Sequence, residues 1–104
     1  MPGTTMETLM PAYVIADVQV TDPAGYEAYK RGVPDTISAH QGRYLVRGGE
    51  TTLLEGDWLP RRMVVLEFPT AQARQDWYDS PEYQALRAIR EKTARSHLIF
   101  VDGI

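Results

Sequence analysis

One alternating stretch near the start of the chain limits the possible folds more than any other feature. From Tyr13 to Val20, every second residue is apolar, which forms the row Val14, Ala16, Val18 and Val20. The opposite row is mixed and contains Tyr13, Ile15, Asp17 and Gln19. A strand of this kind belongs to a sheet with one face under helices and the other face against something less apolar.

A helix is predicted directly after this strand. Asp22 is a good N-cap, and Pro23 suits the first helical position. Helical spacing of buried residues then continues from Tyr26 to His40, and Gln41 and Gly42 end the helix. Pro34 disfavours helical geometry at the residue before it, so we expect a kink or a break into two short helices there. Gly42 is free to adopt the left-handed conformation that ends many helices.

The central part of the chain is predicted to be a hairpin. Residues 43–47 alternate as a strand, which continues over 51–55 after a bulge or bend at two glycines. A loop follows, and residues 61–68 form the partner strand. In this interpretation the helix-facing row of the partner strand consists of Arg62, Val64, Leu66 and Phe68.

The rest of the chain completes a known order of elements. A helical segment over 71–78 breaks and restarts at Ser80, a strong N-cap, and a last strand covers 96–101. The order β-α-β-β-α-β, with right-handed crossovers, predicts an α+β ferredoxin-like sandwich with helices on one face of an antiparallel sheet. Residues 11–104 form this single domain, and residues 1–10 are expected to be a mobile tail. The uncovered face exposes hydrophobic rows, which predicts a face-to-face homodimer.

Composition excludes several classes of protein. The 104 residues include no cysteine, which excludes disulfides, a thiolate nucleophile and a cysteine metal site. The net charge of −3 gives no reason to expect nucleic acid as a partner. No apolar run approaches the roughly 20 residues that cross a membrane, and the start of the chain lacks the features of a signal peptide. A cytoplasmic protein is the expectation.

Three charged residues form the candidate catalytic site. Strand alternation places Arg47 on the uncovered face, together with Asp17 and Glu67 from the neighbouring strands. Partly desolvated in a dimer, this cluster would hold its carboxylates ionised or leave one with a raised pKa as a proton acceptor. The alternative is a structural ion network that determines register and dimer geometry.

Aromatic residues on the helices are candidate core residues that can also line a pocket between helices and sheet. The candidate substrate-binding residues are Tyr83, Trp77, Arg87 and Tyr26. Arg87 lies one turn after Tyr83 and can bind an anion or remain solvated. His40 and His97 lack partners at metal-ligand spacing, and no glycine-rich phosphate loop is present. No metal or cofactor is therefore predicted.

Four motifs occur in one order: GRYLVRGG at 42–49, LEGDWLPR at 54–61, VVLEFP at 64–69 and SPEYQ at 80–84. Together they resemble the domain-of-unknown-function family 1330, over nearly the whole chain after Met10. The polar residues that fit the family pattern are Arg47, Glu55, Glu67, Ser80, Tyr83 and Arg87. Gln41 departs from it, because many relatives have a second glycine before the strand.

The resemblance implies a dimeric α+β barrel, formed by two ferredoxin-like subunits whose sheets pack together. The wider superfamily includes cofactor-free antibiotic-biosynthesis monooxygenases, muconolactone isomerases, stress-responsive barrel proteins and haem-dependent chlorite dismutases. The fold therefore does not determine the function.

Three functions fit the sequence. The first is a homodimer that binds a small anionic or aromatic molecule in the barrel or in a sheet–helix pocket. The second is a cofactor-free monooxygenase- or isomerase-like enzyme acting on a small organic acid, lactone or phenolic compound. The third is a non-catalytic stress-response dimer module. An open pocket of about several hundred Å³, reached by Arg47 and a carboxylate, would favour the enzyme, and a filled interior would favour the module.

Overall fold

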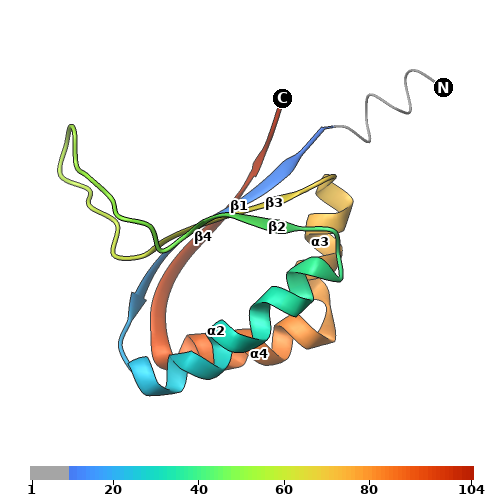
Figure 1. Ribbon diagram of the computed structural model, residues 1–104, viewed down its shortest axis with the longest axis horizontal. Helices are drawn as coiled ribbons and strands as arrows, with labels where there is room; N and C mark the ends of the chain where they lie inside the picture. Colours follow the sequence, from blue (N-terminus) through green and yellow to red (C-terminus); the bar gives the residue numbers. More distant parts are fainter. Residues whose placement is uncertain (1–9) are drawn as a thin grey trace.

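The computed structural model describes residues 10–104, so the predicted tail lies, apart from Met10, outside the described residues. The elements in chain order are β1 (Ala12–Val20), α2 (Pro23–Ser38), β2 (Arg43–Arg47), β3 (Met63–Phe68), α3 (Ala71–Asp79), α4 (Pro81–Thr93) and β4 (Ala94–Asp102). The strands form one antiparallel sheet in the order β2-β3-β1-β4. The helices lie against one face of this sheet (Figure 1). The predicted α+β ferredoxin-like arrangement is confirmed.

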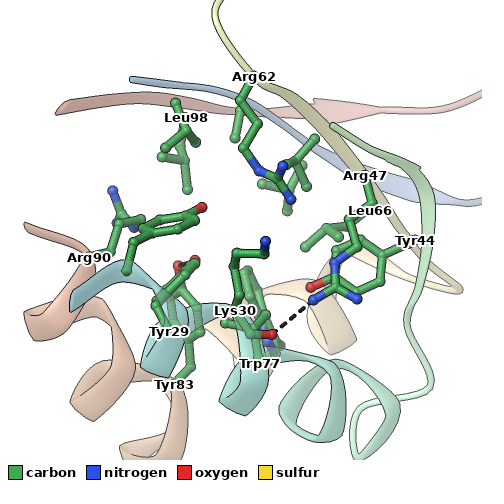
Figure 2. A pocket seen from close by; sticks show the side chains of 16 residues that line it. Tyr29, Lys30, Tyr44, Arg47, Arg62, Leu66, Trp77, Tyr83, Arg90 and Leu98 are labelled. Carbon is green, nitrogen blue, oxygen red and sulfur yellow. Dashed lines mark hydrogen bonds between the residues drawn. The ribbon is translucent and has the colours of Figure 1, made fainter. Parts of the chain in front are cut away.

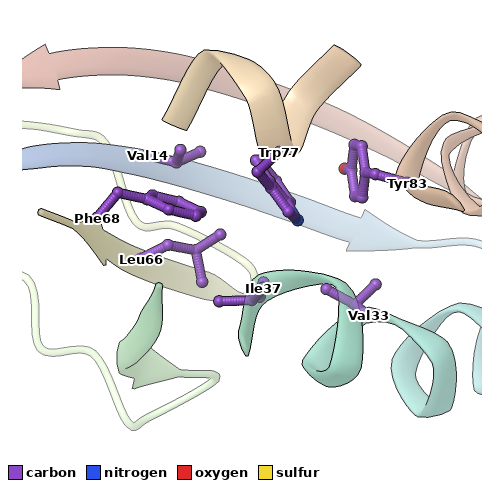
Figure 3. Packing of buried hydrophobic residues seen from close by; sticks show 7 residues of the cluster. All are labelled: Val14, Val33, Ile37, Leu66, Phe68, Trp77 and Tyr83. Atoms are coloured by element: carbon purple, nitrogen blue, oxygen red, sulfur yellow. The ribbon is translucent and has the colours of Figure 1, made fainter. Parts of the chain in front are cut away.

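The core lies between the helices and the apolar row of β1. Val14 is 1% exposed, and Trp77 from α3 and Tyr83 from α4 pack with it. Figure 3 shows these side chains with Val33 and Ile37 of α2 and Leu66 and Phe68 of β3. Fully burying one such side chain stabilises the fold by about 1.5–3 kcal/mol, so this cluster holds the helices against the sheet.

Pro34 does not break α2 into two short helices, which was one of the two outcomes expected from the sequence. The helix is continuous from Pro23 to Ser38, with Pro34 inside it. A proline has no N–H, so it leaves the carbonyl four residues earlier, that of Lys30, without its usual donor. Arg47 Nη2 donates to that carbonyl oxygen at 2.8 Å. The orphaned acceptor is thus satisfied from β2, which reduces the penalty of keeping the helix intact.

The residue with the left-handed conformation after α2 is Gln41 rather than Gly42. Gln41 has the positive φ of 62°, a conformation that favours glycine. The Gly42 amide donates to the Ile37 carbonyl at 2.9 Å, as at many helix ends. Gly42 is needed for a different reason, because a Cβ there would lie 2.5 Å from Phe68 Cε1 and 2.8 Å from Ile37 Cγ2. The prediction that Gly42 provides the left-handed residue was wrong.

The hairpin between β2 and β3 contains a bulge that the alternation does not reveal. Tyr44 pairs with Leu66 and Val46 pairs with Val65, so Leu45 is the extra residue. Residues 51–55 do not continue the strand and instead belong to the β2–β3 loop, residues 48–62. This loop projects beyond the sheet (Figure 1).

The face of the sheet opposite the helices, here called the open face, carries the mixed row of β1. Tyr13, Ile15 and Asp17 lie on it, and from β4 come Ile99, 55% exposed, and Val101, 39% exposed. Within residues 10–104, no helix is long and apolar enough to cross a membrane.

Candidate functional site

The three predicted catalytic residues do not form a cluster. Asp17 is opposite Met63 and Glu67 is opposite Tyr13, so the two carboxylates lie four positions apart on the open face, about 13 Å along the strands. Arg47 lies on the other face of the sheet. The extra residue at Leu45 shifts the alternation by one position, so that Arg47 points to the face opposite to that of Arg43. The expected line of Asp17, Glu67 and Arg47 across the open face is therefore wrong.

Asp17 anchors the β2–β3 loop. Its carboxylate accepts a hydrogen bond from the Arg61 amide at 2.9 Å and another from Trp58 Nε1 at 3.1 Å. Desolvation raises the pKa of Asp17, but these hydrogen bonds outweigh it and leave the pKa below its ordinary value. The group is ionised at neutral pH, and its contacts hold the loop against the sheet.

Glu67 belongs to a separate ion pair on the open face. Arg43 donates to Glu67 Oε1 from Nε and Nη2, both at 2.8 Å, and the Tyr13 hydroxyl donates to Oε2 at 3.0 Å. The hydrogen bond from Arg43, followed by that from Tyr13, lowers the pKa of Glu67. Glu67 is therefore a satisfied carboxylate rather than a poised base.

A pocket lies on the opposite side, between the sheet and helices α2 and α4 (Figure 2). The helix–sheet pocket has a volume of about 40 Å³. Its polar and aromatic lining consists of Tyr26, Tyr29, Lys30, Tyr44, Arg47, Arg62, Trp77, Tyr83 and Arg90, and the remaining lining residues are apolar. Among residues 10–104, no aspartate or glutamate lines it. A site with four cationic side chains and no acid favours an anion.

Arg90 is the most deeply placed of these cations. It is 7% exposed, and its buried Nε has no acceptor within the described part of the chain. Burial lowers the pKa of Arg90, but the neighbouring Tyr83 and Tyr29 outweigh this effect and raise it, so the guanidinium is charged. A buried charge without a counter-ion is unfavourable, and such groups concentrate at functional sites.

Two phenols stand beside Arg90. The hydroxyls of Tyr29 and Tyr83 are 2.8 Å apart and share one hydrogen bond. Burial, followed by the effect of the adjacent Tyr83, raises the pKa of Tyr29 far above its ordinary value. The Tyr29 phenol therefore stays protonated at neutral pH and can donate a hydrogen bond, but it cannot act as a base.

The outer part of the pocket has two more guanidinium groups. Arg47, which is exposed, is held by the Lys30 carbonyl and lies over the Tyr44 ring at 4.7 Å from its centre. Arg62 is half-buried, and its Nε also lacks an acceptor among the residues described. The Lys30 ammonium is 3.4 Å from Glu27, which partly neutralises it.

The arginines outside the pocket differ in their carboxylate partners or their exposure, although the buried Nε atoms of Arg74 and Arg87 also lack an acceptor in the described part of the chain. Arg43, Arg74 and Arg87 each form an ion pair with a carboxylate, and the others are exposed: Arg31, Arg61 and Arg95. In the described structure, the pocket arginines have no carboxylate within ion-pair distance. Unpaired guanidinium groups thus gather in one place. No group of histidine and acidic side chains in residues 10–104 could hold a metal ion.

Comparison with known proteins assigns a family to the chain. Residues 11–104 match the family described as "Domain of unknown function (DUF1330)". The chain belongs to this family. The comparison with curated proteins gave no match.

Solved structures similar to this DUF1330 protein share its fold. The RPA0582 protein of unknown function from Rhodopseudomonas palustris has a TM-score of 0.74 and 17% identity, over all of this chain and 94% of that one. A dimeric ferredoxin-like protein of unknown function from Thermobifida fusca has a TM-score of 0.63 and 16% identity, over 91% and 92% of the two chains. SnoaB from Streptomyces nogalater, a cofactor-independent oxygenase, has a TM-score of 0.61 and 14% identity, over 88% and 91%.

The pocket of this DUF1330 protein contains part of the predicted substrate-binding set. Tyr26, Trp77 and Tyr83 line it, whereas Arg87 lies outside and pairs with Glu91 at 3.3 Å. Five polar lining residues were not among the predicted site residues: Tyr29, Lys30, Tyr44, Arg62 and Arg90. The helical period could have identified Arg90, because it follows Tyr83 by seven residues and shares its face of the helix.

Proposed function

We propose that this protein binds a small organic anion in the helix–sheet pocket. The observation that carries the proposal is the buried guanidinium of Arg90, whose Nε has no acceptor among residues 10–104. A bound carboxylate would provide the missing acceptor and neutralise the charge. The apolar side chains between the polar groups would contact the rest of the ligand.

The size of the pocket limits how a ligand can sit. About 40 Å³ holds a few water molecules or one carboxylate group, which is less than a drug-sized ligand requires. The long side chains of Lys30, Arg47 and Arg62 form the outer wall. Those of Lys30 and Arg62 can change rotamer, whereas the hydrogen bond to the Lys30 carbonyl holds Arg47. We infer that the carboxylate enters first and the ligand body lies toward this wall.

A panel of carboxylates in a thermal-shift assay tests the proposal. Small apolar carboxylates such as benzoate are expected to raise the unfolding temperature, because ligands that bind only the folded state stabilise it. The uncharged amides of the same acids should have no effect, since they lack the charge that Arg90 requires. Equal shifts for acids and amides, or none for any acid, would contradict anion binding and favour the non-catalytic stress-response dimer module.

An enzyme acting at the same pocket is the second candidate function. The likeness to SnoaB, described as a cofactor-independent oxygenase, supports an oxygenase reaction. The substrate expected from the sequence is a small organic acid, lactone or phenolic compound. In that case Arg90 and Tyr29 would stabilise an enolate or phenolate oxygen. No carboxylate or histidine lines the pocket in the described residues, so a proton-transfer mechanism that uses such a base has no support here. Oxygen uptake with phenolic acids would distinguish an oxygenase from a binding protein.

We also infer that the protein is a homodimer joined through the open face. Ile99 and Val101 are exposed there, and the exposed Trp58 and Leu59 of the β2–β3 loop lie near Asp17 and His97. The likeness to the dimeric protein from Thermobifida fusca supports the same arrangement. A cytoplasmic location stays a prediction from the sequence.

Sedimentation equilibrium tests the dimer. We expect twice the chain mass of 11.8 kDa at micromolar concentration, because the exposed apolar row favours association. An Ile99→Lys variant should shift the protein to monomers, since a charge in the centre of an apolar interface is unfavourable. A Lys92→Glu change on exposed α4 is the control and should leave the mass unchanged. A wild-type monomer would contradict the inference.

A further inference from the structure

We infer that the ligand is an elongated dianion with an acidic group at each end, one bound by Arg90 and the two tyrosines and the other by Arg62 and Arg47. The inference rests on the proposed function and specifies its ligand class. It follows from the placement of the unpaired donors, which form two groups rather than one.

The inner group of donors, which consists of Arg90, Tyr29 and Tyr83, has more hydrogen-bond donors than acceptors. Tyr29 and Tyr83 share one hydrogen bond at 2.8 Å, which uses one of their two hydroxyl hydrogens. The second hydroxyl hydrogen and the Nε of Arg90 have no acceptor in the described residues. A carboxylate has two oxygens and no donor, so one such group satisfies both.

The outer group of donors, which consists of Arg47 and Arg62, lies on the other side of the pocket. Figure 2 shows Arg90 and Arg47 at opposite sides, with the Arg62 head group extending from the sheet toward the space between them. Arg47 uses Nη2 for the Lys30 carbonyl, which holds the guanidinium in place and leaves other donors available. The buried Nε of Arg62 has no acceptor among residues 10–104.

Charge balance favours a second negative group. Lys30 has Glu27 at 3.4 Å, so among the described residues the pocket cations without a carboxylate partner are the three guanidinium groups, of which that of Arg47 is also exposed. A monoanion at Arg90 would leave Arg47 and Arg62 unpaired beside each other. The sheet side of the wall between the two ends is apolar, with Val64, Leu66 and Leu98, whereas the Lys30 side chain lies between the two ends on the helix side (Figure 2).

Titration calorimetry with matched acids tests the inference on the full chain. Two pairs are used: terephthalate with its monomethyl ester, and fumarate with its monomethyl ester, all at constant ionic strength. In at least one pair the diacid is expected to bind at least about tenfold more tightly, because the second carboxylate makes charge-assisted hydrogen bonds. Sulfate is the control for an inorganic oxyanion.

Variants at the two ends separate the two binding groups. Arg47→Met should lower the affinity of the diacid toward that of the ester while leaving the affinity of the ester unchanged. Arg90→Met should weaken both members of the pair. Circular dichroism of each variant checks that the fold is retained, and Arg62→Met repeats the outer-end test if Arg47→Met unfolds.

The outcomes distinguish this inference from the function on which it rests. Equal affinity of diacid and ester in both pairs, or equal weakening of both ligands by Arg47→Met, would overturn the dianion while leaving anion binding intact. Sulfate binding as tight as the better diacid would also overturn it. If neither diacid binds, the dianion is rejected, and the carboxylate panel then decides whether anion binding fails as well.

Discussion

Replacing Arg90 by methionine is expected to abolish stabilisation by carboxylates and, at the same time, to make the ligand-free protein more stable. Arg90 is a buried cation without a carboxylate partner among residues 10–104, and methionine fills similar space without the charge. We expect a gain of roughly 1–2 kcal/mol in the free energy of unfolding, because protonated phenols do not neutralise the charge and removing such a buried charge is often stabilising. Binding should weaken by about tenfold or more, since a hydrogen bond to a charged group contributes about 1.5–3 kcal/mol. Urea unfolding with and without benzoate measures both effects.

Arg87→Met is the matched control on the same helix. Arg87 lies one turn before Arg90, pairs with Glu91 at 3.3 Å and does not line the pocket. Its loss should change stability by less than about 1 kcal/mol, as for other exposed ion pairs, and should leave binding unchanged. Destabilisation by Arg90→Met with no change in binding would show that Arg90 is a structural residue whose charge the tyrosines stabilise.

Replacing Pro34 by alanine is expected to strengthen α2 and weaken anion binding. The alanine amide would restore the intrahelical hydrogen bond to the Lys30 carbonyl, which should stabilise the helix by about 1–3 kcal/mol. That carbonyl is also the acceptor for Arg47 Nη2 at 2.8 Å, and although its oxygen can accept two hydrogen bonds, each donor weakens it as an acceptor for the other. A less restrained Arg47 should bind a diacid several-fold less tightly. Urea unfolding and calorimetry with terephthalate measure the two changes.

Pro81→Ala provides the control for this substitution. Pro81 is the first residue of α4, where no intrahelical hydrogen bond is missing. Its replacement should change neither the diacid affinity nor, beyond about 1 kcal/mol, the stability. Destabilisation by Pro34→Ala, or unchanged binding of the diacid in that variant, would contradict the role assigned to the Lys30 carbonyl.

Opposite effects on stability and binding are the shared feature of the two variants. In both cases a helix contains a residue that is unfavourable for stability. Arg90 in α4 is a buried charge without a carboxylate partner among the described residues, and Pro34 lies in the interior of α2. Such residues persist at functional sites, where the local loss is offset by what the residue does. Their position around one pocket is consistent with the proposed function.

The candidate site was only partly accessible from the pattern of residues. Tyr26, Trp77 and Tyr83 could be predicted to line a pocket, because helical spacing reveals which side chains face the sheet. Strand alternation alone places Arg47 on the wrong face of the sheet. The cause is the bulge at Leu45, since one extra residue reverses the side of every later position in the strand.

The sequence by itself determined the order of elements, the row of β1 that lies under the helices and the family. Each of these depends on local periodicity, on N-caps such as Asp22 and Ser80, or on motifs that are continuous in the chain. Only the tertiary structure decided which carboxylates pair with which arginines, and therefore which arginines remain without a partner. Those pairings join residues far apart in the chain, such as Arg43 with Glu67, and depend on a strand register that local patterns do not specify.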